Sequence, residues 1–208
     1  MSGIGKTVAL CVGFIAIVIA MFVFSKFRVP QLSEEELREQ GVFILPRPRD
    51  IAPFELAGGF SNEDLKDKWS FIFFGFTNCP DVCPTSMAEL GKADLAIRES
   101  GREGDHAFQG VLVSVDPDRD PLERVENYAQ AFSPRFIGSV GEREALVELT
   151  QQVNVAFAKV PDGEGQYTVD HTGNLVIINP MGHYHGFMKL PHDSEIIRLT
   201  YQTLAARF

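Results

Sequence analysis

The stretch FIFFGFTNCPDVCPTSM, residues 71–87, joins an apolar run to two cysteines that are each followed by proline. The run FIFFGF (71–76) is short and continuously apolar, which predicts a buried strand. Pro84 suits the first position of a helix, so a helix over 84–99 is expected, with Cys83 as its cap residue. The inner face of that helix would carry Met87, Leu90, Ala93 and Ile97. Cys79 and Cys83 then lie at the carboxyl edge of the sheet, where open α/β sheets bind ligands.

The spacing of Cys79 and Cys83 leaves three residues between them, which makes a wider loop than the common two-residue spacing. Both sulfurs could turn toward a common metal, and a disulfide stays within reach. A helix start stabilises thiolate through its free N–H groups and its dipole. Two thiolates are too few for a closed structural zinc site but suit copper(I), which is a soft ion. A site that also held copper(II) would need an added imidazole.

The rest of the chain alternates between apolar runs and helical patterns. Strands are predicted over 110–116 and 174–180, an extended segment over 155–160, and helices over 145–153 and 194–206. A further helix has a start signal, in which Asp120 is the cap, Pro121 the first helical residue and Glu123 the third after the cap. Strands alternating with helices predict α/β layers around a partly parallel sheet.

The N-terminal part is free of charge from Thr7 to Ser25, TVALCVGFIAIVIAMFVFS. A helix there would span roughly 28 Å, enough to cross a bilayer. MFVFSKFRVP after it contains no small-x-small cleavage site, so an uncleaved anchor is favoured over a signal peptide. The predicted organisation is a short tip (1–6), a transmembrane anchor (7–25), a linker (26–48) and a domain (49–208). Balanced flanking charges leave the orientation open.

Length, composition and charge limit the size of the core and the kinds of partner that the chain can have. With 208 residues and 45% hydrophobic content, the chain can bury one full core. The formal net charge is −9 and the 19 lysines and arginines are scattered, so no basic stripe points to nucleic acid.

The five histidines differ in their surroundings. His106 and His192 lie in polar connections and are expected to be solvated. His171, in YTVDHTGNLVII, precedes an apolar strand, and both a ligand role and a satisfied loop residue remain open for it. His183 and His185 lie in NPMGHYHGFM (179–188), where they and Met181 could form an auxiliary copper site. The alternative is a hairpin turn at Met181–Gly182, with both histidines on one solvent face.

Three segments together resemble the Sco/SenC family of membrane-anchored copper proteins. They are FGFTNCPDVCPTSM, VSVDPDRDPLERVENYAQAF and YTVDHTGNLVIINPMG, in this order and spacing, and the resemblance runs from about residue 40 to the C-terminus. It implies a thioredoxin-like fold and copper, as Cu(I) and Cu(II), bound by Cys79, Cys83 and His171. It also implies a domain facing the periplasm or the mitochondrial intermembrane space. The absence of a long transit-like extension favours a bacterial inner membrane with a periplasmic domain.

The family's role implies assembly of the binuclear copper centre of cytochrome c oxidase subunit II. A metallochaperone that hands over copper is the favoured function. The alternative is a thiol–disulfide oxidoreductase that reduces the target's cysteines through a redox-active Cys79–Cys83 pair, so enzymatic activity stays open. Another copper chaperone or a thiol reductant would be a further partner. A peroxide-reducing enzyme ranks lower, because no activating arginine or glutamine accompanies Cys79. The charged segment DPDRD (116–120) is a candidate partner contact, although capping by Asp120 alone would explain that residue.

Overall fold

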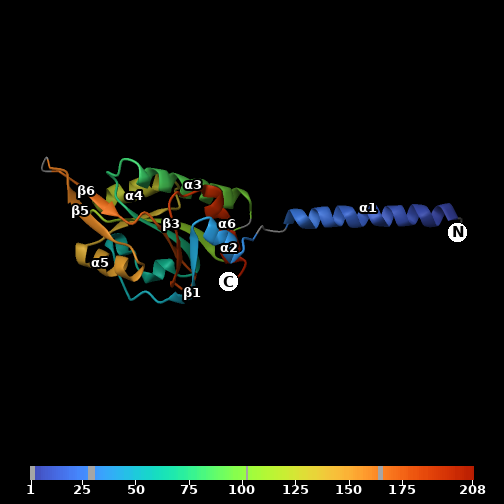
Figure 1. Ribbon diagram of the computed structural model, residues 1–208, viewed down its shortest axis with the longest axis horizontal. Helices are drawn as coiled ribbons and strands as arrows, with labels where there is room; N and C mark the ends of the chain where they lie inside the picture. The colour runs from blue at the N-terminus through green and yellow to red at the C-terminus, as the bar shows by residue number, and fades with distance from the viewer. Residues whose placement is uncertain (1–2, 28–30, 102, 164–165) are drawn as a thin grey trace. The chain divides into compact units, whose positions relative to one another are not determined.

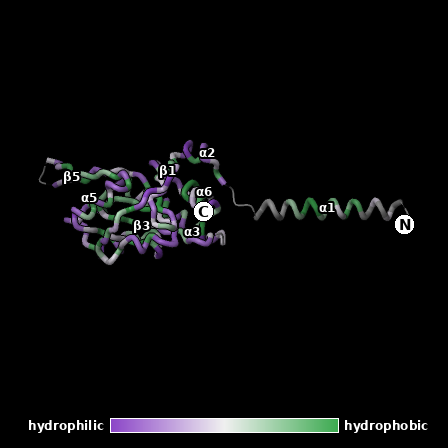
Figure 2. The backbone as a smooth tube through the Cα atoms, turned by 90° about the horizontal axis from the view of Figure 1, so that it is seen from below, coloured by the Kyte–Doolittle hydropathy of each residue, from purple (hydrophilic) through white to green (hydrophobic). Residues whose placement is uncertain are grey.

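The computed structural model describes residues 3–27, 31–101, 103–163 and 166–208, and it divides into two compact units, Met1–Gln31 and Leu32–Phe208. The first unit holds helix α1 (Gly3–Phe27), whose tube in Figure 2 is white to green along its middle. Over the described residues, no helix combines the length and apolarity that crossing a membrane requires. The transmembrane anchor at 7–25 therefore remains a prediction.

The second unit is built on a six-stranded sheet with the order β1-β8-β7-β2-β3-β4. Figure 1 labels two of its strands, β1 and β3. Its strands are β1 (Val42–Arg49), β2 (Lys68–Gly75), β3 (Ala107–Ser114), β4 (Ile137–Val140), β7 (Leu175–Ile178) and β8 (Tyr184–Met188). Strands β2, β3 and β4 run parallel, whereas β7, β8 and β1 add antiparallel pairs. The expected α/β architecture with a partly parallel sheet is confirmed.

The central strands are buried on both faces, as their apolar runs predict. Every residue of β2 after Lys68 is buried, because helices cover the sheet on each side. The helices of this unit are α2 (Glu34–Glu39), α3 (Val82–Glu99), α4 (Leu122–Gln130), α5 (Arg143–Gln152) and α6 (Ser194–Ala205), with short 3₁₀ turns at Ala57–Gly59 and Asn62–Leu65. Helix α3 buries the inner face predicted for it: Met87, Leu90, Ala93 and Ile97 are all inaccessible.

The predicted start of α4 is wrong in its capping residue. The helix begins at Leu122, with Pro121 at the cap position and no side-chain cap bond. Asp120 is fully buried, and its carboxylate accepts hydrogen bonds from Thr77 and Ser114. Because a buried carboxylate needs several donors, these tertiary bonds take the oxygens that a cap would have used.

Part of the segment expected to be a linker, 26–48, is folded. Ser33 and Glu36 form a capping box at the start of α2. Figure 2 shows this helix as hydrophilic, and Leu37 is its one buried residue. Strand β1 then pairs antiparallel with β8 at the sheet edge. Pro46 and Pro48 fit there, because an edge strand can do without two of its hydrogen-bond donors.

A second, two-stranded sheet pairs β5 (Phe157–Pro161) with β6 (Tyr167–His171) and carries His171 at its end. We call this β5–β6 pair the histidine hairpin. The extended segment predicted at 155–160 corresponds to β5, whereas β6 was not predicted. The hairpin forms no ladder with the main sheet over the described residues, so side-chain contacts must hold it in place.

Candidate metal centre

The two cysteines lie at the carboxyl edge of β2, in the loop that leads into α3. Cys79 is partly exposed, whereas Cys83 is fully buried as the second residue of the helix. The expectation that Cys83 caps the helix is wrong, because Asp81 occupies the cap position and the helix starts at Val82. The Cys83 backbone N–H donates to the sulfur of Cys79 over 3.4 Å, and the two sulfurs lie within 4.8 Å of each other.

His171 meets the cysteines from the end of β6. Its Nε2 lies 3.6 Å from the Cys83 sulfur, and the ligand atoms of Cys79, Cys83 and His171 all lie within 4.8 Å of one another. Its Nδ1 lies 3.2 Å from the carbonyl oxygen of Thr172. Because a carbonyl only accepts, Nδ1 must carry the proton in that bond, and Nε2 keeps its lone pair for a metal.

Aromatic packing holds the imidazole between two residues of the strand and its loop. The rings of Phe73 and Phe76 each meet His171 edge-on, with ring centroids 5.8 Å away. Gly75 lies beneath the site, and a Cβ atom there would come within 3.0 Å of the Cys83 sulfur and 2.9 Å of the Phe73 ring. The absence of a side chain at Gly75 therefore makes room for the buried sulfur.

Burial controls the protonation of the metal-free site. It raises the pKa of the Cys83 thiol well above its ordinary value, and the hydrogen bond with Cys79 adds to the shift. Burial also lowers the pKa of His171, against the opposing bond to Thr172. The predicted thiolate at the helix start is therefore not the state of free Cys83, since desolvation outweighs the helix dipole. A metal must displace the Cys83 proton, whereas the imidazole is already neutral.

The donor set suits a soft or borderline ion. Two sulfurs and one imidazole nitrogen match copper, and the cluster is too small for closed four-ligand zinc. Within the described ranges, these three residues are the one group of three or more histidine, cysteine or acidic side chains close enough to share an ion. The structure thus brings together Cys79, Cys83 and His171.

The side chains considered for an auxiliary copper site at 179–188 have separate surroundings. Met181 is 59% exposed beside Gly182, in the turn between β7 and β8. His183 lies 3.2 Å from Asp50, whereas the His185 ring meets Trp69 edge-on and its Nδ1 lies 3.3 Å from the Asn179 side chain. The two histidines are therefore directed to different partners.

His106 and His192 were expected to be solvated, and for His192 this expectation is wrong. It is 8% exposed, its Nδ1 lies 2.9 Å from the Ser86 hydroxyl, and burial lowers its pKa to about 4. His106 is half-buried and packs edge-on against Phe208. The contacts of His192 with Phe73 and Ser86 join distant parts of the chain, so its local sequence gave no sign of burial.

Fold and site together define a class of protein: an α/β domain with two cysteines after a central strand and a histidine from a separate hairpin, arranged for a soft metal. A family model described as SCO1/SenC matches residues 48–205. The chain belongs to the SCO1/SenC family.

Individual relatives agree with this assignment. The chain is 36% identical over 159 residues to a putative copper-binding protein of Stutzerimonas stutzeri, covering 74% of this chain and 76% of that protein. It is 30% identical to the human mitochondrial SCO1 homologue, covering 76% of this chain but 52% of the human protein. The crystal structure of Arabidopsis thaliana ScoI with copper bound superposes with a TM-score of 0.68 at 29% identity, covering 76% of this chain and 98% of that one. The thioredoxin-like fold is thereby confirmed. The chain spans about half the length of the human relative.

Proposed function

We propose that this protein is a copper metallochaperone that binds copper through Cys79, Cys83 and His171 and delivers it to the binuclear copper centre of cytochrome c oxidase subunit II. The observation that carries the proposal is the convergence of two sulfurs and a free imidazole nitrogen within 4.8 Å. Copper-binding relatives and the family's work in oxidase assembly support it.

The ligand set suits an ion that must be held and then released. Copper(I) accepts two thiolates, and copper(II) gains most from the added imidazole. Cys79 is partly exposed, whereas Cys83 is buried behind it. An incoming thiolate of a target protein would therefore reach copper from the Cys79 side. A second copper chaperone is the proposed source of the ion.

A second candidate function is thiol–disulfide exchange with the cysteines of the target site. The closeness of the two sulfurs and the partial exposure of Cys79 favour it, because a target thiol could reach the Cys79 sulfur while Cys83 stays buried beside it. This function would require a separate thiol reductant to restore the pair.

Complementation of a strain that lacks this gene separates the two functions. The readouts are the copper content of the oxidase and the thiol state of the subunit II cysteines. Copper delivery predicts that, without this protein, the target cysteines are reduced but empty. Thiol reduction predicts that they accumulate as a disulfide, and that His171→Ala restores oxidase assembly as well as wild type does.

We further propose that residues 7–25 anchor the protein in a bacterial inner membrane with the domain in the periplasm. The uncharged apolar run and the missing cleavage site support this location. Protease added to spheroplasts should remove the domain and leave cytoplasmic markers intact. A domain that is protected until lysis would contradict it.

A further inference from the structure

The three proposed ligands come from two substructures that share no strand ladder in the described part of the chain. Cys79 and Cys83 belong to the β2–α3 connection of the main sheet, whereas His171 ends the histidine hairpin. A metal can use all three only if the hairpin is held in a fixed place against the main sheet. The question is which side chains hold it.

Contacts from the loop after β3 supply the link to the hairpin. The Arg119 Nε donates to the buried carboxylate of Asp116 over 2.5 Å, and its Nη1 donates to the Tyr167 carbonyl oxygen over 2.8 Å. The guanidinium lies 3.8 Å from the centre of the Tyr167 ring, and the Tyr167 hydroxyl donates to the other Asp116 oxygen over 2.8 Å. Tyr167 is thus held through its backbone, ring and hydroxyl.

The same loop also holds the cysteine segment. The Asp120 carboxylate accepts the backbone N–H of Thr77 over 2.8 Å and the Thr77 hydroxyl over 2.5 Å. Thr77 lies two residues before Cys79, and Tyr167 lies four residues before His171 in β6. Residues 116–120 therefore connect the two halves of the ligand set.

We propose that Arg119 is a positioning residue that keeps His171 within reach of the two cysteines. The inference rests on the proposed copper site and adds the device that completes it. Without Arg119, the hairpin loses the hydrogen bond to the Tyr167 carbonyl oxygen and the guanidinium stacked on the Tyr167 ring, keeping only the bond from the Tyr167 hydroxyl to Asp116, and His171 moves away from Cys83. Copper(II) then loses its imidazole ligand, whereas copper(I) keeps both sulfurs.

Arg119→Gln in the full chain tests this. Before any metal is added, amide exchange in β5 and β6 should become faster, with β2 and β3 unchanged. In copper(II) titrations, the nitrogen hyperfine coupling in the electron paramagnetic resonance spectrum should weaken and the affinity should fall by about 10- to 100-fold, as for other residues that orient a metal ligand. Removing a positive charge would by itself raise the affinity for a copper cation. A fall in copper(II) affinity therefore indicates lost positioning of His171 and not a changed electrostatic field.

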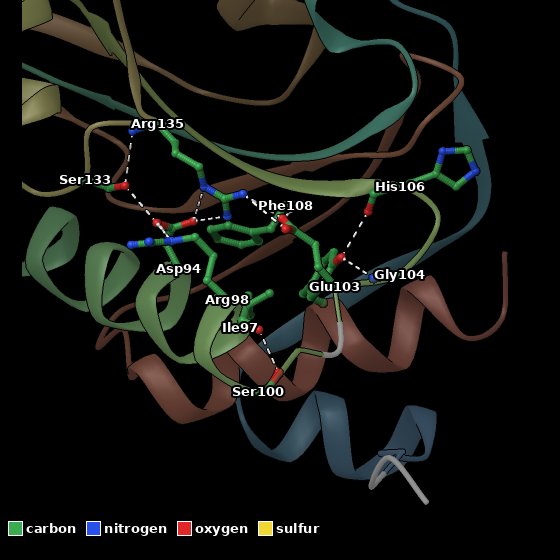
Figure 3. Close-up of polar contacts among 11 residues, drawn as sticks. Asp94, Ile97, Arg98, Ser100, Glu103, Gly104, His106, Phe108, Ser133 and Arg135 are labelled. Carbon is green, nitrogen blue, oxygen red and sulfur yellow. Dashed lines mark hydrogen bonds and ion pairs between the residues drawn. The ribbon is translucent and has the colours of Figure 1, made fainter. Parts of the chain in front are cut away.

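Arg135→Gln is the matched control. As Figure 3 shows, Arg135 also binds a fully buried carboxylate, that of Asp94, and it further contacts Glu103. Its loss should lower the thermal stability but leave the exchange of the hairpin and the nitrogen coupling unchanged. If Arg119→Gln does not fold, Arg119→Lys replaces it. Lys keeps the charge beside Asp116 but lacks the planar guanidinium, so the hairpin exchange and the copper(II) affinity of Arg119→Lys should lie between those of wild type and Arg119→Gln.

Two results would overturn the proposal. One is an Arg119 variant in which the amide protection of the hairpin and the nitrogen hyperfine coupling equal those of wild type. The other is a loss of hairpin protection and nitrogen coupling in Arg135→Gln as large as the loss in the Arg119 variant. The exchange experiment needs no metal. If the wild-type chain took up no copper, the proposed function would fail while the exchange result still decided whether Arg119 holds the hairpin.

Discussion

The Nε2 of His171 lies 3.6 Å from the sulfur of Cys83, although the two residues are separated by 88 positions in the chain. The bond between Nδ1 and Thr172 directs the Nε2 lone pair toward the sulfurs, and the edges of Phe73 and Phe76 fix the ring. Any metal that enters between the sulfurs therefore meets a nitrogen that needs no deprotonation.

Replacing His171 by Ala should affect the two copper oxidation states unequally. Copper(I) tolerates low coordination, so binding by two thiolates should persist. Copper(II) should bind at least about tenfold more weakly, which corresponds to about 1.4 kcal/mol. Competition titrations with copper(I) and copper(II) chelators measure both values on the same preparation.

His183→Ala and His185→Ala are the controls for this substitution, because each contacts partners outside the cysteine cluster. Both should keep the wild-type affinity for copper(II). If one of them lost it while His171→Ala did not, the assigned nitrogen ligand would be wrong.

The affinity for copper should rise with pH. Because burial raises the pKa of Cys83, its thiol is protonated at neutral pH and must lose the proton when it binds. Each proton released should add about a factor of ten in affinity per pH unit, below the thiol pKa. Isothermal titration in buffers with different ionisation enthalpies counts the protons. An affinity that did not change between pH 6 and 8 would contradict the protonated resting state.

His192 should make the fold sensitive to acid. Its folded-state pKa is about 4, below the ordinary value of 6.5, so the unfolded chain binds more protons between these two values. Stability therefore falls as the pH drops from 6.5 toward 4. By linkage, the loss at pH 5 should be about 2 kcal/mol, measured by urea unfolding.

The comparison variant is His192→Gln, which can still contact Ser86 but does not titrate. Its unfolding free energy should decrease less between pH 7 and pH 5 than that of wild type. Other buried histidines contribute equally to both proteins and cancel in the difference. Parallel curves for the two proteins would show that His192 is not the titrating group.

Local patterns predicted the parts of this molecule that depend on local sequence. The apolar run at 71–76 gave the central strand, and the periodicity from Met87 to Ile97 gave the buried face of α3. The motif resemblance predicted the cysteine pair and His171, which the structure brings together.

What the sequence could not predict depends on contacts between distant residues. Asp120 has the pattern of a cap, yet it binds Thr77, which lies 43 residues away. Arg119 was considered only as part of the candidate partner contact at 116–120 and Tyr167 had no assigned role, since nothing near either residue shows that their contact exists. The raised pKa of Cys83 follows from the burial of its sulfur in the packed domain, a property that helix position alone does not reveal.

The copper(I) stoichiometry of the full, reduced chain tests the central claim most directly. Wild type should bind one copper per chain, and Cys79→Ser/Cys83→Ser should bind none tightly, because a hydroxyl is a poor ligand for a soft ion. Cys11→Ser is the matched control, since Cys11 is an exposed thiol on α1 and should not contribute. Stoichiometric copper(I) binding that survives in the double-serine variant, or disappears in Cys11→Ser, would contradict a site built from Cys79, Cys83 and His171.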